Sequence, residues 1–294
     1  MVKKYAVLIA AVCFIFCGCA KKEPGYDVED VTFYSAILNE DMKLKIYLPP
    51  GYAKGEDYPV LYFLPDWGGS AYTVMDQYGT AQTAQRLIET GEIEPIIIAA
   101  IDMDRSFGIN SADAVETVET TSGKVFEKGR YEDYFVQEIV PFIDGRYKTD
   151  AQKDTRYIGG YSMGGFAALH ISLRHPDMFS KAGGHSPSVF IDSFPDETVS
   201  DFLYPTEEIR IERDPIYIVR EGGFVDVSFF LDVESGGSAG VKYLYDTMID
   251  KDIDARYSVM GISHSRMTCS ENMEQYLMFY AGINGTENEG DSYE

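Results

Sequence analysis

Short apolar runs alternate with longer amphipathic stretches along most of the chain. Strand-like runs lie at residues 43–48, 60–64, 96–101, 156–158, 181–184, 228–233 and 256–260. Helical periodicity separates most of them, at residues 80–89, 131–144, 165–174, 241–249 and 272–280. Every residue from 96 to 101 is apolar, as in a strand that is buried on both faces. The alternation predicts an α/β sandwich with a mainly parallel central sheet.

The pattern is interrupted at both ends of the chain and at two internal stretches. Residues 20–30 are polar and residues 285–294 are acidic, which predicts a tether and a tail around one domain at residues 31–284. Residues 103–129 and 187–214 connect predicted elements without a clear period of their own. Loops of that length in a compact domain are usually functional, so we expect these two to wall a substrate cleft.

Residues 1–19 have the features of an export signal. Lys3 and Lys4 precede an apolar run at residues 5–16 that is too short to cross a bilayer comfortably. Gly18 directly before Cys19 is similar to a bacterial lipoprotein cleavage box, in which Cys19 becomes the lipidated first residue. The sequence therefore predicts a cell-surface protein with a lipid anchor, and the alternative is secretion after cleavage of an ordinary signal.

Composition narrows the classes of partner. The 294 residues include 45% hydrophobic residues, enough for one large core. A formal net charge of −23 repels phosphates, so we expect no nucleic acid partner. Three of the four cysteines lie within residues 1–19, and Cys269 is expected to be a packed thiol. Nothing in the sequence indicates the oligomeric state.

The strongest chemical motif is a GxSxG pattern. Residues 157–165 read Tyr-Ile-Gly-Gly-Tyr-Ser-Met-Gly-Gly and are followed by a small-residue helical stretch. A strand, a serine between glycines and a helix form a nucleophile elbow, which predicts that Ser162 is a nucleophile. A second GxSxG occurs at residues 236–240, but too few elements separate Ser238 from His264 for an acid to lie between them. Ser238 is therefore the weaker candidate.

Chain order separates the four histidines. His264 alone follows both Ser162 and a strand that can carry an acid. His170 within a helix and His175 before a proline are expected to be structural. His185 ends a predicted strand near the cleft, and we assign it a substrate-binding role. No histidine pair has a metal-ligand spacing, so we expect no metal and no other cofactor.

Several blocks surround the elbow, and they carry a family resemblance. They are Glu-Pro-Ile at 94–96, Tyr-Glu-Asp-Tyr at 131–134, Glu-Ile-Val-Pro-Phe-Ile-Asp at 138–144, Tyr-Lys-Thr at 147–149 and Arg-His-Pro-Asp-Met-Phe at 174–179. Together with residues 160–165 they resemble the esterase D family of α/β-hydrolases. That family includes feruloyl and acetyl esterases, siderophore esterases, S-formylglutathione hydrolases and mycolyltransferases. The resemblance runs from about Leu44 to Tyr280 and implies a three-layer α/β-hydrolase sandwich.

The resemblance also implies roles for individual residues. Ser162 matches the nucleophile, His264 the general base, and Met163 the residue whose backbone N–H contributes to the oxyanion hole. The other oxyanion donor usually follows a His-Gly pair, whereas residues 64–69 read Leu-Pro-Asp-Trp-Gly-Gly. In that register the donor is the Trp67 N–H. The neighbouring Asp66 carboxylate would oppose an oxyanion unless its side chain turns away.

The acid of the family pattern is missing. The family has Leu-Asp-x-Gly-x-x-Asp after a strand, whereas residues 231–237 read Leu-Asp-Val-Glu-Ser-Gly-Gly and place glycine at the usual aspartate. Glu234 is the first substitute, because it lies at the C-terminal edge of the strand, from which an acid reaches the histidine. Asp232 and Asp226 follow, and a solvated structural carboxylate remains the alternative for each of the three.

Two functions follow from these features. The first is an exported serine esterase that uses a Ser162 acyl-enzyme to hydrolyse an ester of a small molecule or glycan, such as an acyl or feruloyl decoration on polysaccharide, or a siderophore ester. The second is a non-catalytic or weakly catalytic surface lipoprotein of the same fold that binds glycan or peptide. The sequence does not indicate the acyl group, the alcohol, or whether water accepts the acyl chain.

Overall fold

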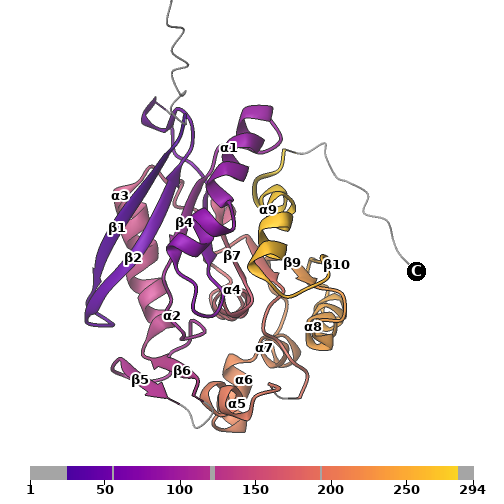
Figure 1. Ribbon diagram of the computed structural model, residues 1–294. Coiled ribbons are helices and arrows are strands. Elements are labelled where there is room, and N and C mark those ends of the chain that lie inside the picture. The colour runs from indigo at the N-terminus through magenta and orange to yellow at the C-terminus, as the bar shows by residue number, and fades with distance from the viewer. Residues whose placement is uncertain (1–24, 55, 120–122, 193, 284–294) are drawn as a thin grey trace, which may run out of the picture.

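The computed structural model describes residues 25–54, 56–119, 123–192 and 194–283 (Figure 1). The predicted signal segment at 1–19 and the predicted tail at 285–294 lie outside the described residues. Among the described residues, no helix has the length and apolar character needed to span a bilayer.

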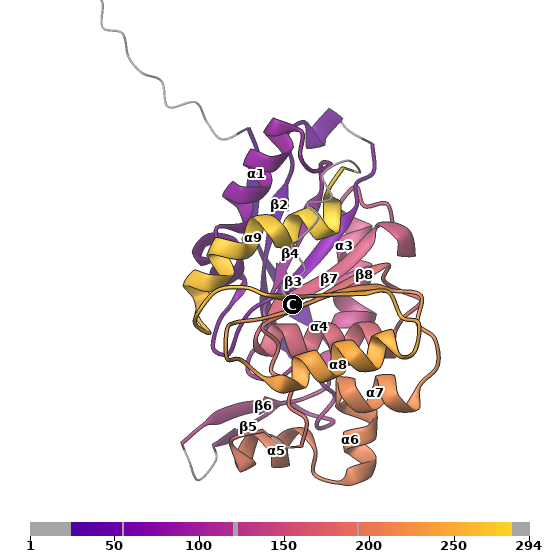
Figure 2. The same ribbon diagram turned by 90° about the vertical axis from the view of Figure 1, so that its right-hand side faces the viewer.

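An eight-stranded sheet forms the centre of the molecule, with helices on both faces (Figures 1 and 2). The strand order is β1-β2-β4-β3-β7-β8-β9-β10. The two strands β1 and β2 are antiparallel to their neighbours, and the other six strands are mutually parallel. The strands are β1 (Asp27–Ser35), β2 (Glu40–Leu48), β3 (Val60–Leu64), β4 (Ile97–Ile101), β7 (Arg156–Tyr161), β8 (Lys181–His185), β9 (Ser228–Val233) and β10 (Ala255–Val259). The prediction of an α/β-hydrolase sandwich with a mainly parallel sheet is confirmed.

The alternation of side chains along the strands divides the core into two parts. In β3, Leu61 and Phe63 face the part that includes α1 (Thr80–Thr90) and α9 (Arg266–Ala281). Tyr62 on the opposite face joins the part that includes α3 (Val140–Arg146), α4 (Met163–Arg174), α7 (Pro215–Glu221) and α8 (Ala239–Ile249). All five residues of β3 are buried, which explains why its sequence is apolar throughout.

Strand β1 is the main element that the apolar pattern did not predict. It begins at Asp27, so the last four residues of the predicted tether pair with β2 instead of leading freely into the domain. The strand lies at the edge of the sheet, and most of its residues are exposed or only partly buried. An edge strand of this kind carries polar residues, which is why it lacks the apolar signature.

The two long stretches contain secondary structure of their own. Residues 103–129 include the hairpin β5 (Glu116–Glu119) and β6 (Val125–Lys128), and residues 187–214 include α5 (Glu197–Leu203) and α6 (Glu207–Arg213). Both views show the hairpin and these helices together at one end of the molecule (Figures 1 and 2). The rings of Phe126 and Phe202 stack there with centroids 4.5 Å apart. An aromatic contact therefore joins the two insertions.

The helix predicted at 131–144 is divided into three segments. They are α2 (Tyr131–Asp133), a π-helical turn at Tyr134–Ile139 and α3 (Val140–Arg146). Pro141, which has no N–H to donate into a regular α-helical ladder, is the second residue of α3 after the wider turn. Shorter helical turns at Tyr52–Lys54, Thr73–Gln77 and Lys153–Thr155 complete the described elements.

Candidate active site

The segments that carry the predicted site residues follow the C-terminal ends of parallel strands. Residues 65–69 follow β3, Ser162 follows β7, Glu234 follows β9, and His264 lies in the loop after β10. In an open parallel sheet these ends meet along one edge, where ligands bind. The topology therefore gathers segments that are up to 200 residues apart in the chain.

Ser162 occupies a strained turn between β7 and α4. Its backbone has φ 58° and ψ −114°, a conformation that costs free energy for a residue with a side chain. A Cβ atom at Gly160 would lie 2.4 Å from the Gly164 carbonyl, and one at Gly164 would lie 2.3 Å from the Leu64 carbonyl oxygen. The two glycines of the motif are therefore required because strand, turn and helix approach one another so closely.

His264 contacts the serine directly. The distance from its Nε2 to Ser162 Oγ is 2.8 Å, an ordinary length for a hydrogen bond from the hydroxyl to a neutral imidazole. The ring stacks on Tyr161, with the centroids 5.2 Å apart. The Tyr161 hydroxyl also accepts a hydrogen bond from the Ser265 N–H at 3.0 Å. Tyr161 at the end of β7 thus contacts the histidine loop twice, through its ring and through its hydroxyl.

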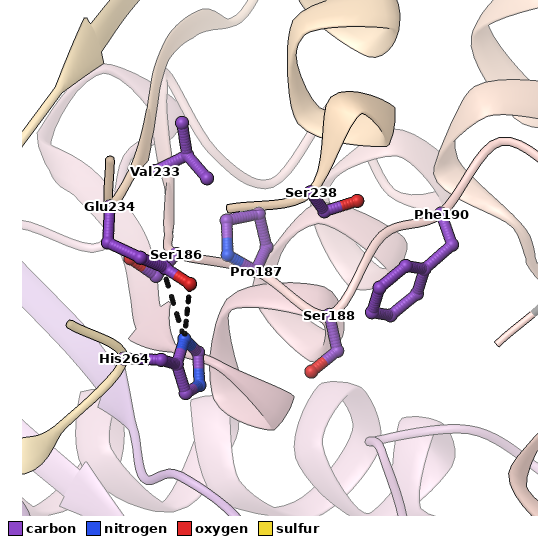
Figure 3. Close-up of a pocket in the computed structure, with 8 residues that line it drawn as sticks. All are labelled: Ser186, Pro187, Ser188, Phe190, Val233, Glu234, Ser238 and His264. Carbon is purple, nitrogen blue, oxygen red and sulfur yellow. Dashed lines mark hydrogen bonds and ion pairs between the residues drawn. The ribbon is translucent and has the colours of Figure 1, made fainter. Parts of the chain in front are cut away.

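Glu234 lies on the other side of the imidazole. Its two carboxylate oxygens are 3.4 Å and 3.5 Å from His264 Nδ1, and Figure 3 shows the two side chains pointing toward each other. These distances exceed the 2.7–2.9 Å typical of a charged hydrogen bond, as is common in catalytic groups without substrate. The Glu234 side chain is 15% exposed, so the carboxylate is largely shielded from water. Ser162, His264 and Glu234 thus form a continuous chain of contacts.

The other two candidate acids have different partners. Asp232 is fully buried, and its carboxylate accepts a hydrogen bond from the Ser186 N–H and lies 2.7 Å from His185 Nδ1. Asp226 is exposed and pairs with Lys153 at 3.0 Å. Of the three described carboxylates, Glu234 is the one beside His264.

The predicted substrate contact of His185 is wrong. Its side chain is 0% exposed, with Nδ1 against Asp232 and Nε2 3.0 Å from the Tyr280 hydroxyl. The ring stacks on Tyr276 with a centroid distance of 3.6 Å. His185 occupies the end of β8, where its side chain points to the face covered by α9 and not into the cleft. What reaches the site is its carbonyl oxygen, which accepts the Ser162 N–H at 2.9 Å.

His170 and His175 are structural, as predicted. Both contact the carboxylate of Glu132 on α2, with His170 Nε2 at 3.1 Å and His175 Nε2 at 2.8 Å, and Arg174 Nε donates to it at 2.9 Å. Burial acts to raise the pKa of Glu132, but the hydrogen bonds from these three side chains hold that pKa well below its usual range. The cluster joins α4, the helix that follows the nucleophile, to α2.

The two predicted oxyanion donors belong to adjacent segments. Met163 is the first residue of α4, so its N–H has no acceptor within the helix. The backbone of Leu64 and Pro65 lies against Gly164, since a Cβ atom there would be 2.3 Å from one carbonyl oxygen and 2.5 Å from the other. This contact brings the loop that carries Trp67 to the start of α4. The Trp67 ring packs on Phe126 with the centroids 4.9 Å apart.

Asp66 turns its carboxylate toward a cation. Arg266 Nε donates to both of its oxygens, at 2.8 Å and 3.1 Å, and the Tyr78 hydroxyl donates at 2.9 Å. No local sequence feature marks Arg266, because its partner lies 200 positions away. The Asp66 side chain is therefore directed toward Arg266, and the cation compensates the negative charge that would oppose an oxyanion.

Ser238 of the second GxSxG motif is a helix cap. Its hydroxyl donates to the Val189 carbonyl oxygen and accepts the Gly240 N–H at 3.1 Å, at the start of α8. The hydroxyl is bonded to backbone groups and not to a histidine. These contacts agree with the prediction that Ser238 is a weaker candidate nucleophile than Ser162.

A cavity of about 200 Å³ adjoins His264 (Figure 3). Its lining consists of Ser186, Pro187, Ser188, Phe190, Val233, Glu234, Ser238 and His264. The stretch at 187–214 therefore contributes a wall, as expected. None of the described residues of 103–129 lines this cavity, so the expectation that this stretch forms a wall is not met there. Its rings pack instead against Trp67 and against the stretch at 187–214.

Two further observations concern the chemistry of the site. Among the described residues, no group of three or more histidine, cysteine, aspartate or glutamate side chains is arranged to hold a metal ion. Cys269 is a buried free thiol on α9, as predicted, and burial raises its pKa well above the usual value. It therefore lacks the thiolate character of a nucleophile.

Comparisons with known proteins agree with this geometry. A model of the Esterase family, described as "Putative esterase", matches residues 35–263. An endo-1,4-beta-xylanase/feruloyl esterase of Xylanibacter ruminicola is 32% identical over 163 residues, which are 53% of this chain but 21% of that protein. The match thus spans about a fifth of the relative's length.

Solved structures share the fold. A ferulic acid esterase superposes with a TM-score of 0.71 at 21% identity, over 87% of this chain and 97% of its own. An S-formylglutathione hydrolase from Agrobacterium tumefaciens gives a TM-score of 0.71 at 19% identity, over 87% of this chain and 95% of its own.

Proposed function

This chain belongs to the Esterase family, and from that premise we propose that it is a carboxylic ester hydrolase, namely an exported serine esterase that acts through an acyl-enzyme on Ser162. The observation that carries the proposal is the 2.8 Å contact between Ser162 Oγ and His264 Nε2, with the Glu234 carboxylate on the far side of the ring. A serine on a strained turn with a histidine in reach is the arrangement that activates a hydroxyl.

Acylation begins when Ser162 Oγ attacks the ester carbonyl carbon. His264 Nε2 takes the hydroxyl proton as the bond forms, and the carbonyl oxygen becomes an oxyanion. The N–H groups of Met163 and Trp67 donate hydrogen bonds to that oxygen. Glu234 stabilises the imidazolium and orients its Nδ1–H. When the tetrahedral intermediate collapses, the bond to the alcohol oxygen breaks and His264 returns the proton to that oxygen.

Deacylation repeats these steps with water. His264 accepts a proton from a water molecule as the water oxygen attacks the acyl carbon, and the bond to Ser162 Oγ then breaks. The proton returns to the serine, which restores the free enzyme. Apart from the ester and the water molecule, each step uses only side chains and backbone groups of this chain.

The cavity bears on the substrate. Its volume of about 200 Å³ is smaller than that of most pockets for drug-sized ligands, which suits one small acyl or aryl group better than an entire glycan. Pro187, Phe190 and Val233 supply apolar wall, and Ser188 supplies a hydroxyl. We therefore favour an acyl or feruloyl ester on a polysaccharide, and a siderophore ester is the second choice. The feruloyl esterase named among the relatives supports the first.

The two sequence features that favoured a non-catalytic binding protein no longer favour it in the folded chain. That interpretation depended on the missing aspartate and on Asp66 beside the oxyanion loop. The Glu234 carboxylate lies 3.4 Å from His264 Nδ1, and Asp66 is paired with Arg266, so both observations support the catalytic proposal. Membership of the esterase family points the same way.

Hydrolysis of a simple activated aryl ester tests the proposal. Ser162→Ala should abolish turnover while leaving the unfolding temperature close to that of the wild type, because the elbow glycines and the core are untouched. Ser238→Ala, the matched control in the second GxSxG motif, should keep its kcat, because Ser238 lines the cavity but its hydroxyl has no histidine partner, so any change should be in KM. Equal losses in both variants, or activity in Ser162→Ala, would contradict the assignment.

A further inference from the structure

Asp66 and Arg266 lie near the site, and each carries a charge that its local backbone position disfavours. Asp66 directly precedes Trp67, so it places a carboxylate beside a backbone N–H that is needed for an oxyanion. Arg266 is the first residue of α9, where the partial positive charge of the helix N-terminus disfavours a cation. A residue that violates a local rule in this way usually serves a purpose elsewhere in the structure.

The two residues satisfy each other. Arg266 Nε donates to both oxygens of Asp66, and its Nη1 donates to the Gln77 side chain at 2.9 Å. Tyr78 donates its hydroxyl to the Asp66 carboxylate and accepts the Asp66 N–H at 3.1 Å. The Asp66 side chain is 17% exposed, so its charge is compensated in partly shielded surroundings. The Asp66 carboxylate accepts three of these hydrogen bonds, which fix its direction, and the Arg266 guanidinium compensates its charge.

Gly69 supplies the space for this orientation. A Cβ atom at Gly69 would lie 2.3 Å from Asp66 Oδ1, and the Gly69 N–H donates to the Asp66 carbonyl oxygen at 2.9 Å. The tight turn at 66–69 therefore accommodates the carboxylate on the side of Gly69 and Arg266. The same turn carries Trp67 toward the start of α4.

We propose that Arg266 is a positioning residue that holds the Asp66 carboxylate away from the oxyanion and neutralises it. The ion pair then joins the loop that carries the Trp67 N–H to the segment that carries His264, two residues before Arg266. This inference rests on the proposed function. The proposed role differs from that of a purely structural ion pair in one respect. The loss of kcat in a variant without Arg266 comes from the unpaired Asp66 carboxylate that remains.

A double-mutant cycle distinguishes the two roles. The variants are Arg266→Gln, Asp66→Asn and the double variant, each assayed for kcat and KM on an activated aryl ester. Arg266→Gln leaves an uncompensated carboxylate beside the oxyanion, so its kcat should fall on the order of 10- to 100-fold with KM within about twofold. Asp66→Asn should retain kcat within about threefold, because no negative charge remains there. The double variant should recover to the level of Asp66→Asn.

Arg86→Gln is the matched control. Arg86 also pairs with a carboxylate on α9, that of Glu274, but both side chains of this pair are about half exposed. Its removal should leave kcat and KM unchanged. A double variant no more active than Arg266→Gln would overturn the inference, as would equal losses in both single variants that track a lowered unfolding temperature. A wild type without turnover would overturn the proposed function, whereas an active wild type without rescue would overturn this inference alone.

Discussion

At the scale of single residues, Glu234 decides how complete the catalytic arrangement is. Glu234→Gln keeps the shape of the side chain but removes the charge that stabilises the His264 imidazolium. We expect kcat to fall on the order of 10²- to 10⁴-fold with little change in unfolding temperature, the upper value being that of the corresponding change in a serine protease. Steady-state kinetics on an aryl ester measure this directly.

Asp226→Asn is the control for that prediction, because Asp226 is exposed and, within the part of the chain that the structure describes, pairs with Lys153 and not with His264. It should have near-wild-type turnover. If Glu234→Gln also retained near-wild-type turnover, the enzyme would work as a Ser162–His264 dyad and the role proposed for Glu234 would be wrong.

Ser162 and His264 could be predicted because each is marked by a feature of the sequence itself. Ser162 lies between glycines that the close packing requires, and His264 stands out by chain order. His185 shows the limit of such reasoning: the strand was predicted, but the face to which its last side chain points depends on the strand's exact register. Arg266 had no signal, because its partner is set by tertiary structure and lies 200 positions away.

At the scale of elements, the Glu132 cluster fastens α4 to α2. Glu132→Gln should lower the free energy of unfolding at pH 7 by about 3 kcal/mol, since it removes the charge of a buried acceptor shared by the buried His170 and the partly exposed Arg174 and His175. The native contacts lower the pKa of Glu132, so its contribution is complete above the ordinary carboxyl pKa of 4.5 and is lost as pH falls below it. The difference in free energy of unfolding between the wild type and Glu132→Gln should therefore become smaller as pH falls below about 4.5.

Denaturant unfolding at a series of pH values measures that difference. Glu274→Gln is the control, because its exposed ion pair with Arg86 should contribute less than about 1 kcal/mol. A difference that stays constant from pH 7 down to pH 3 would show that the Glu132 charge does not stabilise the native state.

The elements themselves were predictable to the extent that burial marks them. The parallel strands β3, β4, β7, β8 and β9 and the helices α1, α4 and α8 carry apolar patterns because they pack in the core. Strand β1 and helix α6 do not, since β1 is a partly exposed edge strand and α6 has no buried residue. Such elements form through backbone pairing and capping, here by Asp30–Lys45 register in the sheet and by Thr206 at the start of α6.

At the scale of the whole molecule, the proposed location depends on residues outside the described structure. A lipid chain at Cys19 would supply affinity for an anionic membrane surface, which a chain with a net charge of −23 otherwise lacks. We expect the mature protein to fractionate with membranes and Cys19→Ser to release it. A wild type that is released after export, or a mature N-terminus at a different residue, would contradict the lipoprotein proposal.

The central claim is that Ser162 is a nucleophile activated by His264 within an exported esterase. Labelling with a fluorophosphonate tests it most directly, because the reagent requires an activated serine but no knowledge of the natural ester. The wild type and Ser238→Ala should each take up one label, located by mass spectrometry on the peptide that contains Ser162, and Ser162→Ala should take up none. A wild type that remains unlabelled, or a label that persists in Ser162→Ala, would contradict the account.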